Sequence, residues 1–236
     1  DEETAALATV NVRPFPNARI TLGRAEDVDF SHLGGAWFDP ARRESRRGRT
    51  ARIHDPEEAT PPLSFVRAVA DEVGAVGAKL APAIDHEHLV PGTETQWVSW
   101  RGQVLEACMY FGPLARRVGE GGLAVPSEAT VGPVGALAEG AVIARSALVL
   151  GSDARSAQLV PDSNDDAELR NPPVGSIGAY LWEPDGAVIR AGLLGTLARK
   201  LGAHTIDDSI AYLSSDDASQ AALDSPLARA FRVREV

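Results

Sequence analysis

The chain has 236 residues, 44% of them hydrophobic and 6% aromatic, and a formal net charge of −10 at pH 7. This apolar content is enough for a packed core and argues against an intrinsically disordered chain. The acidic balance argues against a general nucleic-acid binder, because contacts to phosphates require a cationic surface.

Targeting signals and cysteine content indicate the expected compartment. No window approaches the roughly 18–20 consecutive apolar residues of a transmembrane helix, and no signal-peptide pattern is found. The single cysteine, Cys108, cannot form an internal disulfide, so we expect a reducing, cytoplasmic location and no membrane partner. The chain begins at Asp1 and its only methionine is Met109, which indicates a processed chain or a fragment.

The first third of the chain predicts alternating strands and helices. Residues 1–13 are expected to be helical, because acidic residues occupy the first turn. Residues 18–30 predict a short strand and a polar turn, and a later apolar run ends at Asp39-Pro40. A helix is expected at 61–74 and a buried strand at 75–84. Strand, loop, helix and strand in this order predict a βαβ unit of a parallel sheet.

The middle of the chain predicts two antiparallel hairpins. Residues 94–112 form two apolar runs around a glycine-containing turn, and residues 146–160 repeat this pattern. Between them, residues 119–144 are rich in Gly, Ala and Val without periodicity and are expected to be a loop or insertion. The polar, proline-bounded residues 161–172 predict a linker.

The C-terminal part predicts one long helix and two strands. Residues 186–202 are expected to form a helix that ends at a glycine, with four apolar residues on one buried face: Ile189, Leu193, Leu197 and Leu201. Strands are expected at 208–216 and 228–236. In the last strand, Phe231 and Val233 alternate with arginines, which predicts one buried face and one solvated face.

Several segments together carry a family resemblance. They are "WFDPARR", "KLAPAI", "WVSW" with "VLEACMYFGPLA", and above all "EPDGAVIRAGL" followed by "IAYLSSD". In this order they resemble bacterial class I S-adenosylmethionine (SAM)-dependent methyltransferases that end in a THUMP-like domain. The resemblance implies an α/β fold, with a Rossmann-like methyltransferase sheet at 1–160 and a small α+β THUMP-like domain at 173–236.

The resemblance also implies that part of the cofactor site is absent. Class I methyltransferases hold SAM on a glycine-rich loop after their first strand and on an acidic residue after the second. Here Asp1 resembles the helix cap that follows this acidic residue, and Gly34-Gly35 precedes a strand, not a helix. The chain is therefore expected to be a fragment that lacks the first strands of the sheet and binds SAM weakly.

Four residues are expected in the active site by this resemblance. Glu26 and Asp27 correspond to the acidic position that faces the adenine amino group, although they also fit a solvated turn. Asp39 and Pro40 correspond to a loop that grips the target nitrogen, where Asp39 would position the acceptor. The sequence departs from this loop's usual pattern, because Ala41-Arg42 replaces a proline and an aromatic residue.

A cluster of arginines follows Asp39-Pro40. We expect four of them to bind substrate, and RNA is the expected substrate: Arg42, Arg43, Arg46 and Arg47. A solvated loop paired with nearby acids is the equally weighted alternative. The acidic net charge favours a small-molecule substrate instead, and the departures at Ala41-Arg42 favour a non-catalytic RNA-binding scaffold.

Neither a metal nor a covalent intermediate is expected. The run Asp85-His86-Glu87-His88 contains two histidines, but no further ligand group stands at a recognisable spacing from them. Cys108 lies inside an apolar run and is expected to be a buried structural residue.

Overall fold

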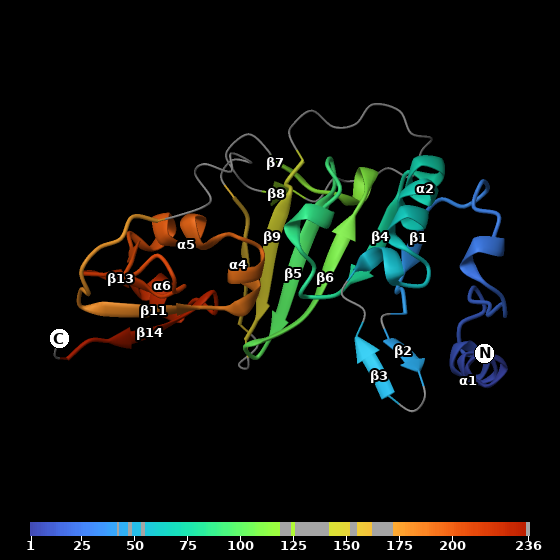
Figure 1. Cartoon of the computed structure of the whole chain (residues 1–236), viewed down its shortest axis with the longest axis horizontal. Coiled ribbons are helices and arrows are strands. Elements are labelled where there is room, and N and C mark those ends of the chain that lie inside the picture. Colours follow the sequence, from blue (N-terminus) through green and yellow to red (C-terminus); the bar gives the residue numbers. More distant parts are fainter. Residues whose placement is uncertain are drawn as a thin grey trace. The chain divides into compact units, whose positions relative to one another are not determined.

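The computed structural model describes most of the chain (Figure 1). The described residues are 1–41, 43–46, 49–52, 55–118, 124–125, 142–151, 155–161 and 172–234, with the backbone alone described at 43–46, 49–52, 118 and 124–125. They form two compact units, Asp1–His32 and Leu33–Val236. Within these ranges, no helix combines the length and apolar character that crossing a bilayer demands.

The unit Asp1–His32 contains the predicted N-terminal helix. Helix α1 spans Glu2–Val12, and the Asp1 carboxylate caps it by accepting a hydrogen bond from the Thr4 amide at 2.8 Å. The predicted strand within 18–30 is wrong, because these residues form irregular backbone and a single 3₁₀ turn, Ala25–Asp27. The described backbone bonds here are local, such as Ala18 N–H to Phe15 O, so the segment has no neighbouring strand to pair with.

The unit Leu33–Val236 is built on a six-stranded sheet with the order β1-β4-β6-β5-β9-β10. Its strands are β1 (Ala36–Phe38), β4 (Val76–Leu80), β6 (Gln103–Tyr110), β5 (Glu94–Trp100), β9 (Arg145–Leu150) and β10 (Ser156–Leu159). The pairs β1/β4 and β5/β9 are parallel, and the other pairs are antiparallel. Four strands therefore run in one direction, and both predicted hairpins are confirmed.

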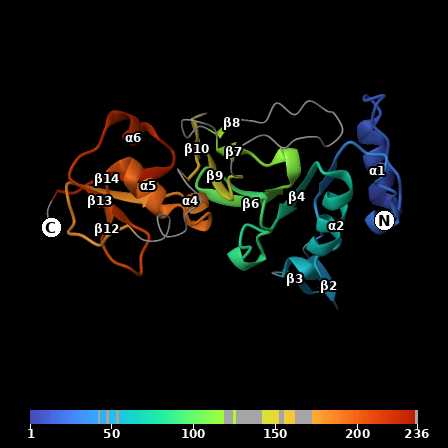
Figure 2. The same ribbon diagram turned by 90° about the horizontal axis from the view of Figure 1, so that it is seen from above.

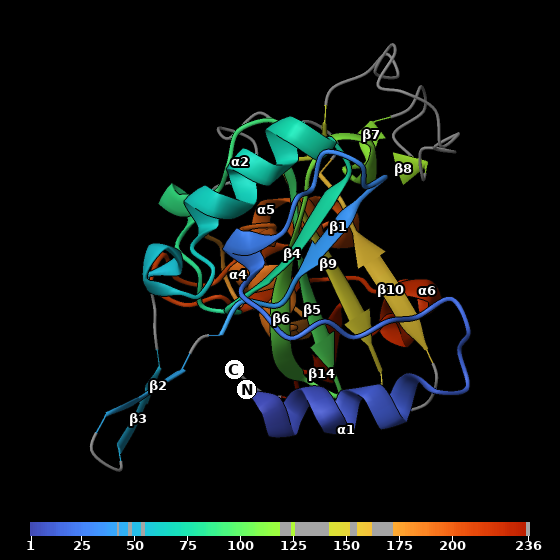
Figure 3. The same cartoon turned by 90° about the vertical axis from the view of Figure 1, so that its right-hand side faces the viewer.

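Helix α2 (Leu63–Val73) connects β1 to β4, so the predicted βαβ unit is confirmed. Figure 3 shows α2 lying along β4. Its apolar side buries Leu63, Val66 and Val69, and the Phe65 ring meets the Phe38 ring edge-on at 6.1 Å. The helix ends at Gly74, whose φ of +85° suits glycine.

Short strands occupy the start of the predicted loop at 119–144. β7 (Arg117–Val118) pairs with β8 (Ala124–Val125), and Val142 bridges to Arg117. The adjoining Ile143 is buried. Residues 119–123 and 126–141 of this loop, and residues 162–171 of the predicted linker at 161–172, lie outside the described residues.

A second sheet forms the C-terminal part of this unit. It has the order β12-β13-β11-β14 and is antiparallel throughout. Its strands are β12 (His204–Thr205), β13 (Leu213–Ser215), β11 (Tyr180–Pro184) and β14 (Ala228–Arg232), with helices α4 (Gly186–Arg190), α5 (Leu194–Leu201) and α6 (Gln220–Asp224). Figure 2 shows α4 between the two sheets, where it packs against β5 and β9.

The predicted helix at 186–202 is two helices, so its single apolar face is wrong. Leu193 and Leu197 are buried, but Ile189 is 45% exposed. Gly192 separates α4 from α5 with a φ of +67°, and a Cβ at this position would lie 2.7 Å from Arg145 Nη1. A tight turn that contacts the first sheet through Arg145 therefore replaces a continuous helix. The predicted end of the helix at Gly202 is confirmed.

The predicted C-terminal strands are shorter than expected. β13 covers three residues of 208–216, and β14 ends at Arg232. Phe231 is 38% exposed, so the expected buried face does not form there. β14 pairs with β11 and lies at the edge of the sheet, and no further strand of the described part of the chain pairs with its other side.

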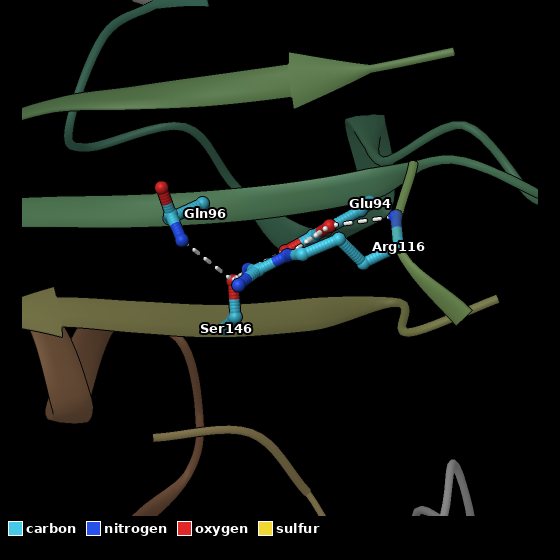
Figure 4. Close-up of polar contacts among 4 residues, drawn as sticks. All are labelled: Glu94, Gln96, Arg116 and Ser146. Carbon is cyan, nitrogen blue, oxygen red and sulfur yellow. Dashed lines mark hydrogen bonds and ion pairs between the residues drawn. The ribbon is translucent and has the colours of Figure 1, made fainter. Parts of the chain in front are cut away.

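A buried polar cluster lies at the start of β5 and β9 (Figure 4). The Glu94 carboxylate has no solvent exposure and accepts hydrogen bonds from the Arg116 guanidinium, from the Arg116 amide at 3.0 Å and from Ser146 Oγ at 2.7 Å. Arg116 Nη2 also donates to Ser146 Oγ at 2.9 Å. Charge pairing and hydrogen bonds together compensate the desolvation of this carboxylate.

We predict that Glu94→Ala lowers the free energy of unfolding by about 3–5 kcal/mol, because it leaves the Arg116 charge without its partner. Urea denaturation measures this change. Glu72→Ala, on the exposed side of α2, is the control and should change stability by less than about 0.5 kcal/mol. Equal stability of the two variants would contradict a structural role for the pair.

Candidate active site

Asp39 and Pro40 directly follow β1 at the edge where the parallel strands end. The Asp39 side chain is 56% exposed, whereas Pro40 is buried. Ala41 and Thr60 exchange two backbone hydrogen bonds, of 2.8 and 3.3 Å, and so close the base of the intervening loop. This bridge holds Asp39 at a defined place beside the sheet.

Lys79 connects Asp39 to a second carboxylate. Its Nζ lies 3.3 Å from Asp39 Oδ2 and 3.6 Å from Glu106 Oε2. The three residues come from the end of β1, from β4 and from β6, which are neighbours in the sheet. The Lys79 and Glu106 side chains are 30% and 29% exposed. Asp39 is therefore the most exposed of the three charged residues, and the other two are largely buried.

One face of the sheet carries this cluster. Lys79 is in register with Cys108, and Gly77 with Tyr110 and Trp37, so these positions alternate with the core residues that α2 covers. The Trp37 ring, 56% exposed, lies over Gly77, where a Cβ would come within 2.4 Å of it. The face of the sheet that carries Asp39 and Lys79 therefore also carries the aromatic residues Trp37 and Tyr110.

Cys108 supports the buried end of the cluster. Its thiol donates to Glu106 Oε1 at an Sγ–O distance of 3.6 Å. Burial, and then the Glu106 charge, raise the pKa of the Cys108 thiol to about 11. The thiol therefore stays protonated at neutral pH and acts as a donor. Burial likewise raises the pKa of Tyr110.

A small cavity adjoins Pro40. It has a volume of about 20 Å³ and is lined by Asp55, Leu63, Lys79 and Ile84, among other residues. A cavity of this size holds about one water molecule. The described surroundings of Pro40 therefore do not form a pocket of cofactor size.

A larger groove lies at the opposite end of the parallel strands, where β5 and β9 begin. It has a volume of about 650 Å³, with His86, Arg145 and Ile189 among its lining residues. His86 Nε2 lies 2.7 Å from the Arg190 carbonyl, and His86 Nδ1 lies 3.1 Å from Arg145 Nη1. Arginine only donates, so Nδ1 accepts and the Nε2–H donates to the carbonyl. The groove is separate from the Asp39 site.

The expected adenine-binding residues belong to the other compact unit. Glu26 and Asp27 lie in the exposed 3₁₀ turn of Asp1–His32. Glu26 pairs with Arg24 at 3.1 Å, and backbone hydrogen bonding together with Arg24 lowers the pKa of its carboxyl group. Both residues carry acceptors suited to an amino group, and both stay cofactor-binding predictions.

The arginine cluster follows Asp39-Pro40 as a hairpin. β2 (Arg43–Arg46) pairs with β3 (Arg49–Arg52), and the register opposes Arg43 to Arg52 and Arg46 to Arg49. Arg42 and Arg47, also predicted to bind substrate, lie outside the described residues.

A possible cation site lies in the loop after β4. Ligand atoms of Asp85, Glu87 and His88 lie within 4.8 Å of one another, and Asp55 Oδ1 is 4.0 Å from His88 Nε2. Asp85 and Glu87 are exposed and come from a single 3₁₀ turn, so the geometry fits a weakly held surface cation at most.

Sequence reasoning missed Lys79 and Glu106. They lie on strands whose pairing is not visible in the sequence, and each is separated from Asp39 by many residues. The available signal was a charged residue within a predicted buried strand, because a lysine in such a place needs a partner. Lys79 is one of only two lysines in the chain.

Comparison with known proteins finds similarity to methyltransferases. No protein-family model matches the sequence. The chain is 32% identical over 182 residues to an uncharacterized S-adenosylmethionine-dependent methyltransferase of Mycobacterium tuberculosis, found in strains CDC 1551 and H37Rv. The match covers 76% of this chain, and the chain spans only about 40% of the relative's length.

A solved structure establishes the fold. The chain superposes on a Porphyromonas gingivalis W83 protein assigned to the methyltransferases with a TM-score of 0.55 and 20% identity, over 86% of this chain and 43% of that protein. The six-stranded sheet and its helices therefore have the Rossmann-like α/β fold of methyltransferases, as the sequence predicted.

We predict that Cys108 reacts slowly with iodoacetamide at pH 8 in the native chain. A pKa of about 11 lowers the thiolate fraction roughly 100-fold compared with the ordinary value of 9.0, and burial slows the reaction further. Mass spectrometry measures the rate, with the urea-unfolded chain as the control. Labelling of the native chain as fast as the unfolded one would show that Cys108 does not serve as a buried donor.

Proposed function

We propose that this chain is the acceptor-binding part of a SAM-dependent methyltransferase in which Asp39 positions the methyl acceptor. The observation that carries the proposal is the place of Asp39-Pro40, at the end of a parallel strand in a methyltransferase fold. The mycobacterial relatives, named as SAM-dependent methyltransferases, support this activity and this cofactor. SAM would supply the methyl group.

The described surroundings of Asp39 and Pro40 are not by themselves a SAM pocket. The cavity beside Pro40 is far smaller than a nucleoside, and Glu26 and Asp27 lie in an exposed turn of the other unit. We therefore derive only the acceptor side of the reaction. An Asp39 carboxylate that accepts from an amino N–H would hold the nitrogen in a defined orientation, so its contribution is positioning.

We further propose RNA as the substrate. The hairpin of β2 and β3 directly follows Asp39-Pro40 and its two strands contain four arginines in their sequence, and binding to phosphates requires cationic residues. The small α+β sheet at 173–236, proposed as a THUMP-like domain after the 161–172 linker, fits an RNA-binding role. The net charge of −10 favours a small-molecule acceptor as the second candidate.

We predict that Asp39→Ala lowers kcat by about 10²-fold with little change in SAM affinity, because a misplaced acceptor loses orientation. The variant is compared in a polypeptide of the relatives' full length that includes these 236 residues, with labelled SAM and total RNA. Asp71→Ala, exposed on α2, is the matched control. Full activity of Asp39→Ala would reduce Asp39 to a structural turn.

We predict that replacing Arg43, Arg46 and Arg47 by alanine weakens binding to single-stranded RNA equally for different sequences. The slope of log K against log salt should flatten by about 2, at ~0.7 per phosphate contact. Replacing the exposed Arg13, Arg19 and Arg67 removes the same charge and should leave the slope unchanged. An unchanged slope in the first variant would favour a small-molecule acceptor.

A further inference from the structure

We infer that Lys79 and Glu106 are positioning residues that fix the Asp39 carboxylate for an acceptor carrying an exocyclic amino group. This inference rests on the proposed function and specifies the chemistry of its acceptor. It starts from the chain of contacts that runs from the Cys108 thiol through Glu106 and Lys79 to Asp39.

The contacts fix one Asp39 oxygen and leave the other available. Lys79 Nζ lies 3.3 Å from Oδ2, and no hydrogen bond to Oδ1 occurs among the described residues. The Asp39 carboxylate can therefore present Oδ1 to a ligand while Lys79 holds Oδ2. With Asp39 56% exposed and Lys79 only 30% exposed, the ligand would approach from solvent.

Glu106 in turn fixes Lys79. Its Oε2 lies 3.6 Å from Nζ, and its Oε1 accepts from the Cys108 thiol, so both oxygens are engaged. An ammonium on a four-carbon stem has many rotamers, and two carboxylates on either side restrict them. A single exposed ion pair contributes about 0–1 kcal/mol, so stability alone does not account for three charges placed in a row across three strands.

The charge balance points to the acceptor's chemistry. Two carboxylates and one ammonium leave a surplus of one negative charge. This surplus repels a carboxylate or phosphate at the reacting position and favours a group that donates, such as an exocyclic amino group. The phosphates of an RNA would be bound elsewhere, at the arginine hairpin, while the amino group reaches Asp39.

A matched pair of probes tests this chemistry on the 236-residue chain. Cytidine carries an amino group where uridine carries a carbonyl oxygen, so only cytidine can donate to Asp39 Oδ1 at that position. We expect cytidine to bind about tenfold more tightly than uridine, as one charge-assisted hydrogen bond would give. Ligand-observed saturation-transfer NMR measures both affinities. Asp39→Ala, which removes both side-chain oxygens, should abolish the preference.

Variants of Lys79 test whether this residue positions the Asp39 carboxylate. Lys79→Met should reduce the cytidine preference to less than about twofold, and Lys79→Arg should restore most of it, because Arg also pairs with both carboxylates. Lys200→Met, at the chain's other lysine, which is exposed on α5, should have no effect. In ¹³C-lysine spectra, Asp39→Asn and Glu106→Gln should each shift the Lys79 ε-resonance and leave that of Lys200 unchanged.

Two results would overturn the inference. Equal binding of cytidine and uridine, or no binding of either, would refute an acceptor held through an exocyclic amino group, because uridine keeps only its ring N3–H as a donor. A cytidine preference that Lys79→Met leaves intact would refute positioning by Lys79. Failure of the proposed function is distinguishable, since it would appear as absent methyl transfer by the full-length polypeptide while the binding preferences and spectral shifts hold.

Discussion

The burial of the Glu94 carboxylate is the constraint on which the first sheet depends. A charge without solvent exposure must be matched at fixed geometry, and Arg116 and Ser146 provide this match from two other segments. Strand β5 cannot slide by one residue against β9 without separating Glu94 from Ser146 and moving it to the other face. The register fixed at this end extends along β5 and β6 toward the Asp39 edge.

In the first sheet, the two ends of the parallel strands differ in their chemistry. Where β1 and β4 end, exposed charges of both signs face solvent beside a buried proline. Where β5 and β9 begin, polar groups are buried or bound to the C-terminal helices. Ligands of open α/β sheets bind at the carboxyl ends of the strands. The Asp39 edge is therefore the one on which function is proposed.

Hydrophobic periodicity and turn residues predicted the helices and hairpins that depend on residues close together in the sequence. The helix at 61–74 and the hairpins at 94–112 and 146–160 follow from periodicity and turn residues. The strand expected within 18–30 failed because a strand exists only through its neighbour. Asp39 was recognisable from "FDPAR", but its partner Lys79 was not, because cross-strand contacts depend on the order of strands in the sheet. The break at Gly192 reflects a close approach to Arg145 that no periodicity shows.

The contact between α4 and the first sheet tolerates substitution at one position and restricts it at another. His86 binds the carbonyl of residue 190, a group that every amino acid carries, so this attachment does not depend on the arginine side chain. Two residues later, Gly192 has a φ of +67°, and a Cβ at this position would meet the guanidinium end of Arg145 and the His86 ring. A position free to diverge thus lies close to one whose backbone conformation favours glycine. A lineage could alter the charge of this surface repeatedly while the two sheets keep the same attachment.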